Sequence, residues 1–69
     1  MEIMLPERLK NLRKERGLSQ KELAEELQLT QRKISYLETG QLEPDLATLW
    51  KISNFFEVTT DYLLGIKDD

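Results

Sequence analysis

The sequence predicts an all-α fold of five short helices. Apolar residues recur three or four positions apart along most of the chain, and no stretch alternates apolar and polar residues as a strand would. Residues suited to starting a helix precede these stretches, and glycines follow three of them. The 69 residues suffice for one domain, expected to span 1–69. Such a domain buries roughly 60% of the surface of its unfolded chain.

The first helix is expected at residues 6–16. Pro6 suits its first turn, where the N–H that proline lacks would have no partner. Gly17 provides a stop, because glycine readily takes the left-handed conformation that ends many helices. Four residues recur at helical spacing: Leu5, Leu9, Leu12 and Arg16.

The second helix is expected at residues 20–27. Ser19 is a good N-cap, and Glu22 stands three residues later, where it completes a capping box. Such a pair satisfies two backbone N–H groups that would otherwise lack partners. The apolar stripe of this helix consists of Leu23, Ala24 and Leu27.

The third helix is expected to begin at Gln31, after Thr30 as its N-cap, and to end at Gly40. Only residues 28–30 separate it from the second helix. A connection this short folds two helices sharply against each other, which defines the helix-turn-helix motif. The motif is expected over about residues 20–39.

The fourth helix is expected between Asp45, its N-cap, and Phe56, after a loop over residues 39–44. Thr59 then caps a last short helical turn, which Gly65 closes. One face of the fourth helix is expected to carry Leu46, Leu49, Ile52, Ser53 and Phe56.

The composition argues against an enzyme. The chain has no cysteine and no histidine, which removes thiol chemistry, the commonest general base and the commonest metal ligand. We therefore expect no cofactor, no metal site and no small-molecule ligand. No apolar run approaches the ~20 residues that cross a bilayer, so no membrane partner is expected and the protein should be cytoplasmic.

The formal net charge of -3 is unusual for a nucleic-acid binder, but the charges are unevenly distributed. Residues 1–33 contain eight Lys or Arg and six acids, whereas residues 34–69 contain two and seven. The positive charge is therefore gathered in the first half of the chain, which is compatible with a DNA-binding face.

The expected third helix has two different faces. Ile34 and Leu37 face inward, whereas the outward positions carry amide, guanidinium, hydroxyl and phenol groups. Gln and Arg at the start of a helix suit bidentate reading of adenine and guanine edges in the major groove. An ordinary polar surface is the equally weighted alternative from these residues alone. The outward residues are Gln31, Arg32, Ser35 and Tyr36.

Glu38 stands beside the inward face of the third helix, four residues after Ile34. An unpaired carboxylate there would be costly. Arg13 likewise stands four residues after Leu9, beside the inward face of the first helix. We therefore expect an Arg13–Glu38 ion pair that fixes the third helix against the first. The alternative is that both side chains reach water independently.

These motifs resemble the phage-repressor helix-turn-helix family, of Cro and C1 type and also called XRE, over about residues 7–65. The resemblance implies the five-helix fold of the lambda repressor. The matching segments occur in order and at the family's spacing: Arg8-Leu9-Lys10-x-Leu12-Arg13, Gly17-Leu18-Ser19-Gln20-x-x-Leu23-Ala24, Ile34-x-x-Leu37-Glu38-x-Gly40, Pro44-x-Leu46-x-Thr48-Leu49-x-x-Ile52 and Val58-Thr59-x-x-x-Leu63-Leu64-Gly65.

The resemblance also implies roles for individual residues. Gln20 matches a position that holds a DNA phosphate and braces the recognition helix. Arg13 and Glu38 match a salt bridge seen in several members. Base-reading positions are matched by Gln31, Arg32 and Tyr36. Positions near the phosphate backbone are matched by Lys33, Ser35, Thr39, Gly40 and Gln41, and electrostatic docking is expected from Arg8 and Lys10.

The chain departs from the family pattern at two points. Gln28 stands where the turn usually has a glycine, at a site expected to need a positive φ. That conformation costs a non-glycine residue roughly 1–2 kcal/mol. Phe55 and Glu57 replace the small residue and the glycine that are common after the fourth helix, so Phe55 is either additional core or part of a contact surface.

Proteins of this type commonly bind DNA as symmetric dimers with half-sites about 34 Å apart, and we expect a homodimer on DNA. Large apolar or amphipathic side chains outside the clearest stripe positions are candidates for its interface. Thickening of a small core is the equally weighted alternative for them. These residues are Trp50, Phe55, Tyr62 and Ile66.

The sequence therefore predicts sequence-specific binding of double-stranded operator DNA, with repression by operator occupancy as the expected outcome. The alternative, from a different class, is an antitoxin-type protein that covers a partner toxin and autoregulates its operon. A co-purifying protein encoded by a neighbouring reading frame would distinguish the two.

Overall fold

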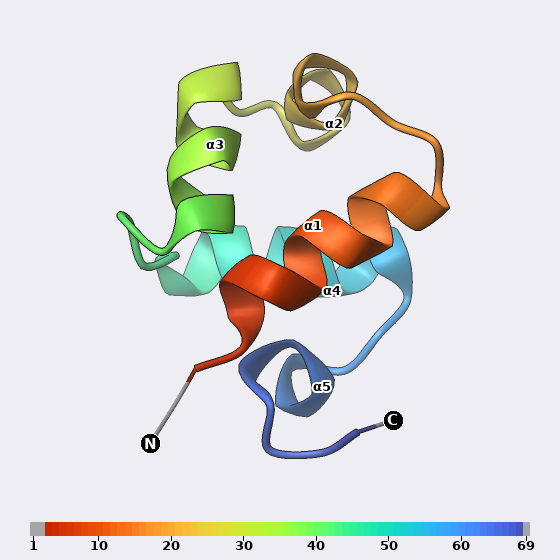
Figure 1. Ribbon diagram of the computed structural model, residues 1–69, viewed down its shortest axis with the longest axis vertical. Helices are drawn as coiled ribbons and strands as arrows, with labels where there is room; N and C mark the ends of the chain where they lie inside the picture. Colours follow the sequence, from red (N-terminus) through yellow and green to blue (C-terminus); the bar gives the residue numbers. More distant parts are fainter. Residues whose placement is uncertain (1–2, 69) are drawn as a thin grey trace.

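The computed structural model describes residues 3–68, which form five α-helices. This part of the chain contains no strand, and none of its helices is both long and apolar enough to cross a membrane. The all-α prediction is confirmed, and the predicted helix bounds agree to within one residue. In chain order the helices are α1 (Leu5–Glu15), α2 (Gln20–Leu27), α3 (Gln31–Thr39), α4 (Leu46–Phe56) and α5 (Thr60–Leu64) (Figure 1).

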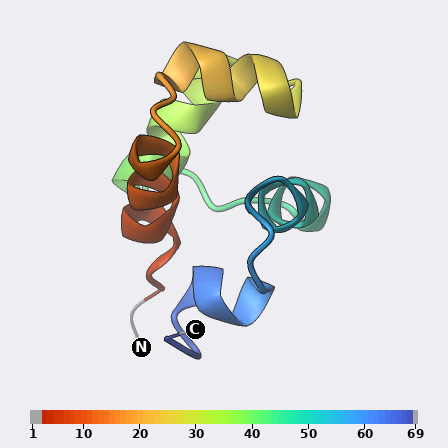
Figure 2. The same ribbon diagram turned by 90° about the vertical axis from the view of Figure 1, so that its right-hand side faces the viewer.

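The helices enclose a shared apolar core. α2 and α3 lie together at one end of the molecule and α5 lies at the other, with α1 and α4 on opposite sides between them (Figures 1 and 2). α1 packs against α3 and α5, while α4 packs against α2 and α5. All five helices bury side chains in this core: Leu5, Leu9, Leu23, Ala24, Leu27, Ile34, Leu37, Ile52, Phe56 and Leu63.

Each of the last four helices begins with a side chain that caps its first turn, as predicted. Ser19 Oγ accepts a hydrogen bond from the Glu22 N–H at 3.0 Å, and Glu22 Oε1 accepts one from the Ser19 N–H at 2.9 Å. These reciprocal bonds complete the expected capping box. The other three caps are Thr30, Asp45 and Thr59, which accept from the N–H groups of Lys33, Thr48 and Tyr62.

Two helices end at a residue that has a left-handed backbone and is not glycine. Gln28, after α2, has a φ of 58°, and Glu57, after α4, has a φ of 55°. Beyond Gln28 the Leu29 N–H donates to the Ala24 carbonyl at 2.8 Å, which closes α2 and turns the chain toward α3. The positive φ expected at Gln28 is therefore confirmed. Its strain arises because Cβ approaches the following carbonyl oxygen.

The predicted inward face of α4 is wrong at one position. Leu46 is 86% exposed, whereas Thr48 is buried. The buried stripe runs through Thr48, Ile52 and Phe56, and residues two apart on a helix point in nearly opposite directions. Leu46 consequently shares the exposed side of α4 with Trp50, four residues later, which is 65% exposed.

Arg13 and Glu38 form an ion pair, as their helical spacing suggested. Arg13 Nε donates to Glu38 Oε2 at 2.6 Å, and Nη2 donates to Glu38 Oε1 at 3.1 Å. Nη1 of Arg13 donates to the Leu18 carbonyl at 2.8 Å, and Gln20 Nε2 donates to Glu38 Oε1 at 3.2 Å. Because both charged residues are buried, this network fixes α3 against α1 and against the start of α2.

Replacing Glu38 with alanine should strongly destabilise the fold, because the Arg13 guanidinium would stay buried without its carboxylate. We expect the free energy of unfolding, measured by urea denaturation, to fall by about 3–5 kcal/mol. The double variant Arg13→Met/Glu38→Leu removes both charges and should recover most of this loss. Glu43→Ala, at an exposed loop position, is the control and should change stability by less than about 0.5 kcal/mol. A double variant no more stable than Glu38→Ala would contradict the explanation.

Replacing Gln28 with glycine should stabilise the protein, because glycine takes a positive φ without the Cβ penalty. We expect a gain of about 1 kcal/mol, seen as a rise of roughly 4–8 °C in the midpoint of thermal unfolding. Glu57→Gly should behave alike. Glu26→Gly, at an exposed position inside α2, is the control and should cost about 1 kcal/mol. Equal destabilisation at positions 26 and 28 would rule out strain at Gln28.

Candidate nucleic-acid interface

α3 presents one face to the core and the other to solvent. Ile34 and Leu37 are completely buried, while Gln31 and Arg32 are exposed and Tyr36 is half-buried. The helix lies at the outside of the molecule, at the end away from α5 (Figure 1). Because an α-helix fits the major groove of DNA, this outward face has the shape that base reading requires.

Arg32 and Tyr36 contact each other on the outward face. Arg32 Nε donates to Tyr36 Oη at 3.1 Å, and the guanidinium carbon lies 5.6 Å from the centre of the Tyr36 ring. The two residues are one helical turn apart, which is the spacing at which side chains meet on a helix surface. The outward face therefore carries a planar group of donors that a neighbouring phenol holds in place.

The end of α3 gathers hydroxyl, amide and backbone groups into a turn. Thr39 Oγ1 donates to the Ser35 carbonyl at 3.1 Å, and Gln41 Nε2 donates to Thr39 Oγ1 at 3.1 Å. The Gln41 N–H donates to the Tyr36 carbonyl at 2.9 Å, across Gly40, whose φ is 79°. This turn stands at the end of α3. It contains Thr39, Gly40 and Gln41, three of the residues that the resemblance associates with the phosphate backbone.

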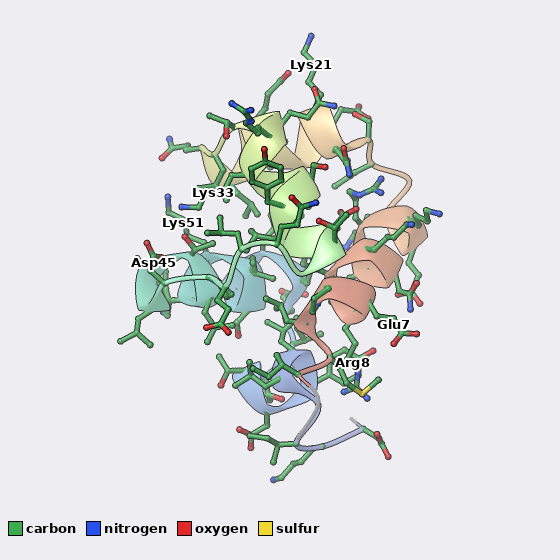
Figure 3. All side chains as sticks on the ribbon, turned by 60° about the vertical axis from the view of Figure 1, so that its left-hand side comes forward. Glu7, Arg8, Lys21, Lys33, Asp45 and Lys51 are labelled. Atoms are coloured by element: carbon green, nitrogen blue, oxygen red, sulfur yellow. The ribbon has the colours of Figure 1, made fainter. Side chains whose placement is uncertain are left out.

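Lys33 extends toward the start of α4. Figure 3 shows its side chain beside Asp45 and Lys51. Hydrogen bonds from Thr48, with smaller contributions from the charges of Lys33 and Lys51, hold the pKa of the Asp45 carboxyl below its ordinary value of about 3.8. Lys51 Nζ also donates to the Leu27 carbonyl at 3.3 Å. The sequence reasoning missed Lys51, because only the folded chain brings this basic residue of α4 next to Lys33.

Arg8, predicted to contact a DNA phosphate, is engaged in contacts within the protein. Its Nη1 donates to the carbonyl oxygens of Tyr62 and Lys67, and its Nη2 lies 3.1 Å from Asp68 Oδ1. The guanidinium also covers the Tyr62 ring at 4.3 Å from its centre, which leaves the Arg8 side chain 11% exposed. Figure 3 shows Arg8 close to α5, at the end of the molecule away from α3. These contacts occupy the charge that was expected to bind phosphate.

Gln20 and Lys10 differ in their surroundings. Gln20, the first residue of α2, is half-buried, and its amide joins α2 to α3 through Glu38. Lys10 is exposed on α1, and within residues 3–68 its side chain forms no hydrogen bond or ion pair. Gln20 is thus held at the junction of the two motif helices, whereas Lys10 supplies a positive charge to the surface of α1.

The four residues considered for a dimer interface do not form one exposed surface. Trp50 and Ile66 are 65% and 67% exposed. Phe55 is half-buried: it packs against the core and edge-on against Phe56, with ring centres 4.9 Å apart, and it also lines a surface pocket together with Trp50. Tyr62 is covered by Arg8. Large exposed apolar side chains among the described residues are Ile3, Leu42, Leu46, Trp50 and Ile66.

Comparison with known proteins connects this arrangement to DNA-binding regulators. The chain is 46% identical over 65 residues to the HTH-type transcriptional regulator ImmR of Bacillus subtilis, a match that covers 94% of this chain and 50% of ImmR. The chain thus spans about half the length of the curated relatives it matches.

Solved structures show the same fold. A transcriptional regulator from Listeria innocua matches with a TM-score of 0.87 and 31% identity, covering 94% of this chain and 61% of that one. The P22 c2 repressor, in complex with a synthetic operator, matches with a TM-score of 0.83 and 28% identity, covering 93% and 96%.

The helix-turn-helix family model HTH_3 matches residues 9–63, which include α2, the turn at Gln28 and α3. This match covers most of the chain and agrees with the fold and with the order of the sequence motifs. The chain therefore belongs to the HTH_3 helix-turn-helix family, the Cro/C1 type of DNA-binding transcriptional regulator.

Proposed function

We propose that the chain binds double-stranded operator DNA in a sequence-specific manner, with α3 in the major groove, and represses transcription by occupying the operator. The observation that carries this proposal is the division of α3 into an anchored inner face and an outward face bearing Gln31, Arg32 and Tyr36. Their side chains offer the donors and acceptors that match base edges. The structural similarity to the P22 c2 repressor, which was solved with a synthetic operator, supports this mode of action.

Contacts to phosphates fix the orientation of such a protein on DNA, while contacts to bases give sequence preference. We assign phosphate contacts to polar and basic groups of α1, α2, α3 and the turn after α3, and omit Arg8, whose guanidinium is engaged near α5. Lys33 supplies a positive charge on α3, and Gln20, the first residue of α2, is hydrogen-bonded to Glu38 of α3. The full set is Lys10, Gln20, Lys33, Ser35, Thr39, Gly40 and Gln41.

We further propose that the protein binds as a symmetric homodimer, since one domain contacts few base pairs and dimers of this class use half-sites about 34 Å apart. The exposed apolar pair Leu46 and Trp50 on α4 supports an interface on that helix, because burying two such side chains between copies is favourable. We include Ile66, which is 67% exposed, as a third apolar residue of this interface.

Selection of bound sequences from a random duplex pool should yield a palindromic consensus. On the selected duplex, Arg32→Ala should weaken binding by about 1–3 kcal/mol and relax the preference at one base pair. Lys33→Ala should instead weaken selected and random duplexes by a similar factor. Titrations by fluorescence anisotropy at a fixed salt concentration would measure both. An equal loss on selected and random DNA for Arg32→Ala would contradict a base-reading role for this residue.

On a duplex carrying both half-sites, two chains should bind cooperatively. Trp50→Glu should reduce this cooperativity, because it places two like charges at the interface, while binding to a single half-site stays unchanged. Sedimentation and titration on one-site and two-site duplexes would measure stoichiometry and cooperativity separately. Glu43→Gln is the matched surface control. Independent binding of two wild-type chains would contradict the dimer, and unchanged cooperativity in Trp50→Glu would exclude this side of α4.

A further inference from the structure

Arg32 and Tyr36 act as one unit on the outward face of α3. The Arg32 Nε–H points to the Tyr36 hydroxyl oxygen at 3.1 Å, and the guanidinium lies near the edge of cation–π range at 5.6 Å from the ring centre. None of the ion pairs within residues 3–68 involves Arg32. In the described part of the chain, the contact that orients this charge is therefore the one with Tyr36.

This contact determines which donors of Arg32 remain available. A guanidinium carries five N–H groups, and Tyr36 accepts the one on Nε. The four N–H groups on Nη1 and Nη2 are left, and they form a planar fork at the tip of the side chain. Such a fork matches two acceptors that lie side by side.

In the major groove, guanine is the base that presents two neighbouring acceptors, O6 and N7. Adenine pairs its N7 acceptor with an N6 amino donor, cytosine presents an amino donor, and thymine presents a single acceptor beside a methyl group. A fork consisting only of donors is therefore satisfied by guanine and is left partly unpaired by the other three bases.

We infer that Arg32 reads a guanine end-on through Nη1 and Nη2, and that Tyr36 is the positioning residue that holds Arg32 in this orientation. The inference rests on the proposed function and makes it more specific, because it names the base that Arg32 recognises. It also gives Tyr36 a role other than the base reading implied by family resemblance. Tyr36 is half-buried while Arg32 is exposed, so the phenol ring is packed against more of the protein than the guanidinium it contacts.

The test compares the sequences selected from a random duplex pool by the wild type and by Arg32→Ala, Tyr36→Phe and Tyr62→Phe. The wild type should select one guanine per half-site whose preference disappears in Arg32→Ala, a loss of roughly 5- to 150-fold in discrimination at that base pair. Tyr36→Phe keeps the ring and removes the acceptor. It should lower the preference for the same guanine by about 2- to 10-fold and leave all other positions unchanged. Tyr62→Phe removes a phenolic hydroxyl on α5 and should select the wild-type consensus.

Two further measurements separate positioning from direct reading. In the Arg32→Ala background, Tyr36→Phe should have no additional effect on the guanine preference, because the residue it supports is absent. Replacing the guanine by 7-deazaguanine, which lacks the N7 acceptor, should weaken the wild type but not Arg32→Ala. Circular dichroism of each variant verifies that it is folded.

The possible outcomes discriminate between the claims. If the wild type selects no consensus, the proposed function fails. If a consensus appears but Tyr36→Phe leaves it intact, or alters a different base pair, the positioning role of Tyr36 is wrong. If Arg32→Ala relaxes a position that is not guanine, the assignment of the base is wrong.

Discussion

The buried ion pair between Arg13 and Glu38 is the constraint on which the rest of the arrangement depends. It connects α1 to α3, and through the Leu18 carbonyl and the Gln20 amide it also holds the segment that leads into α2. Charges inside a small domain are costly unless all their hydrogen bonds are made, and here each partner is bonded more than once. The network therefore does more than add stability. A shifted register of α3 would leave both buried charges without partners, so the network favours the register in which Ile34 and Leu37 face the core.

Much of the fold could be predicted from the sequence because its determinants are local. Ser19, Thr30, Asp45 and Thr59 cap helices through groups three residues away, so a short window of sequence contains the whole interaction. The Arg13–Glu38 pair could also be predicted, because each residue stands beside a clear apolar stripe and an isolated buried charge needs a partner.

The errors have long-range causes. Arg8 was expected on a DNA face because of its charge, yet it is held by Tyr62, Lys67 and Asp68, more than fifty positions away in the sequence. Leu46 looked apolar enough for the core, but the stripe of α4 is set by contacts with other helices and passes through Thr48 instead. For the outward face of α3, the sequence indicated which groups are present, whereas the contact between Arg32 and Tyr36 required coordinates.

The left-handed residues at Gln28 and Glu57 have a consequence for the amount of protein in a cell. A chain of 69 residues has a total stability of roughly 3–10 kcal/mol, so about 1 kcal/mol of strain at each position is a substantial share. Differences of 1–2 kcal/mol change the unfolded fraction that proteases and chaperones act on, and can alter abundance several-fold. Strain at these two helix ends therefore raises the fraction of this domain that is unfolded at any moment.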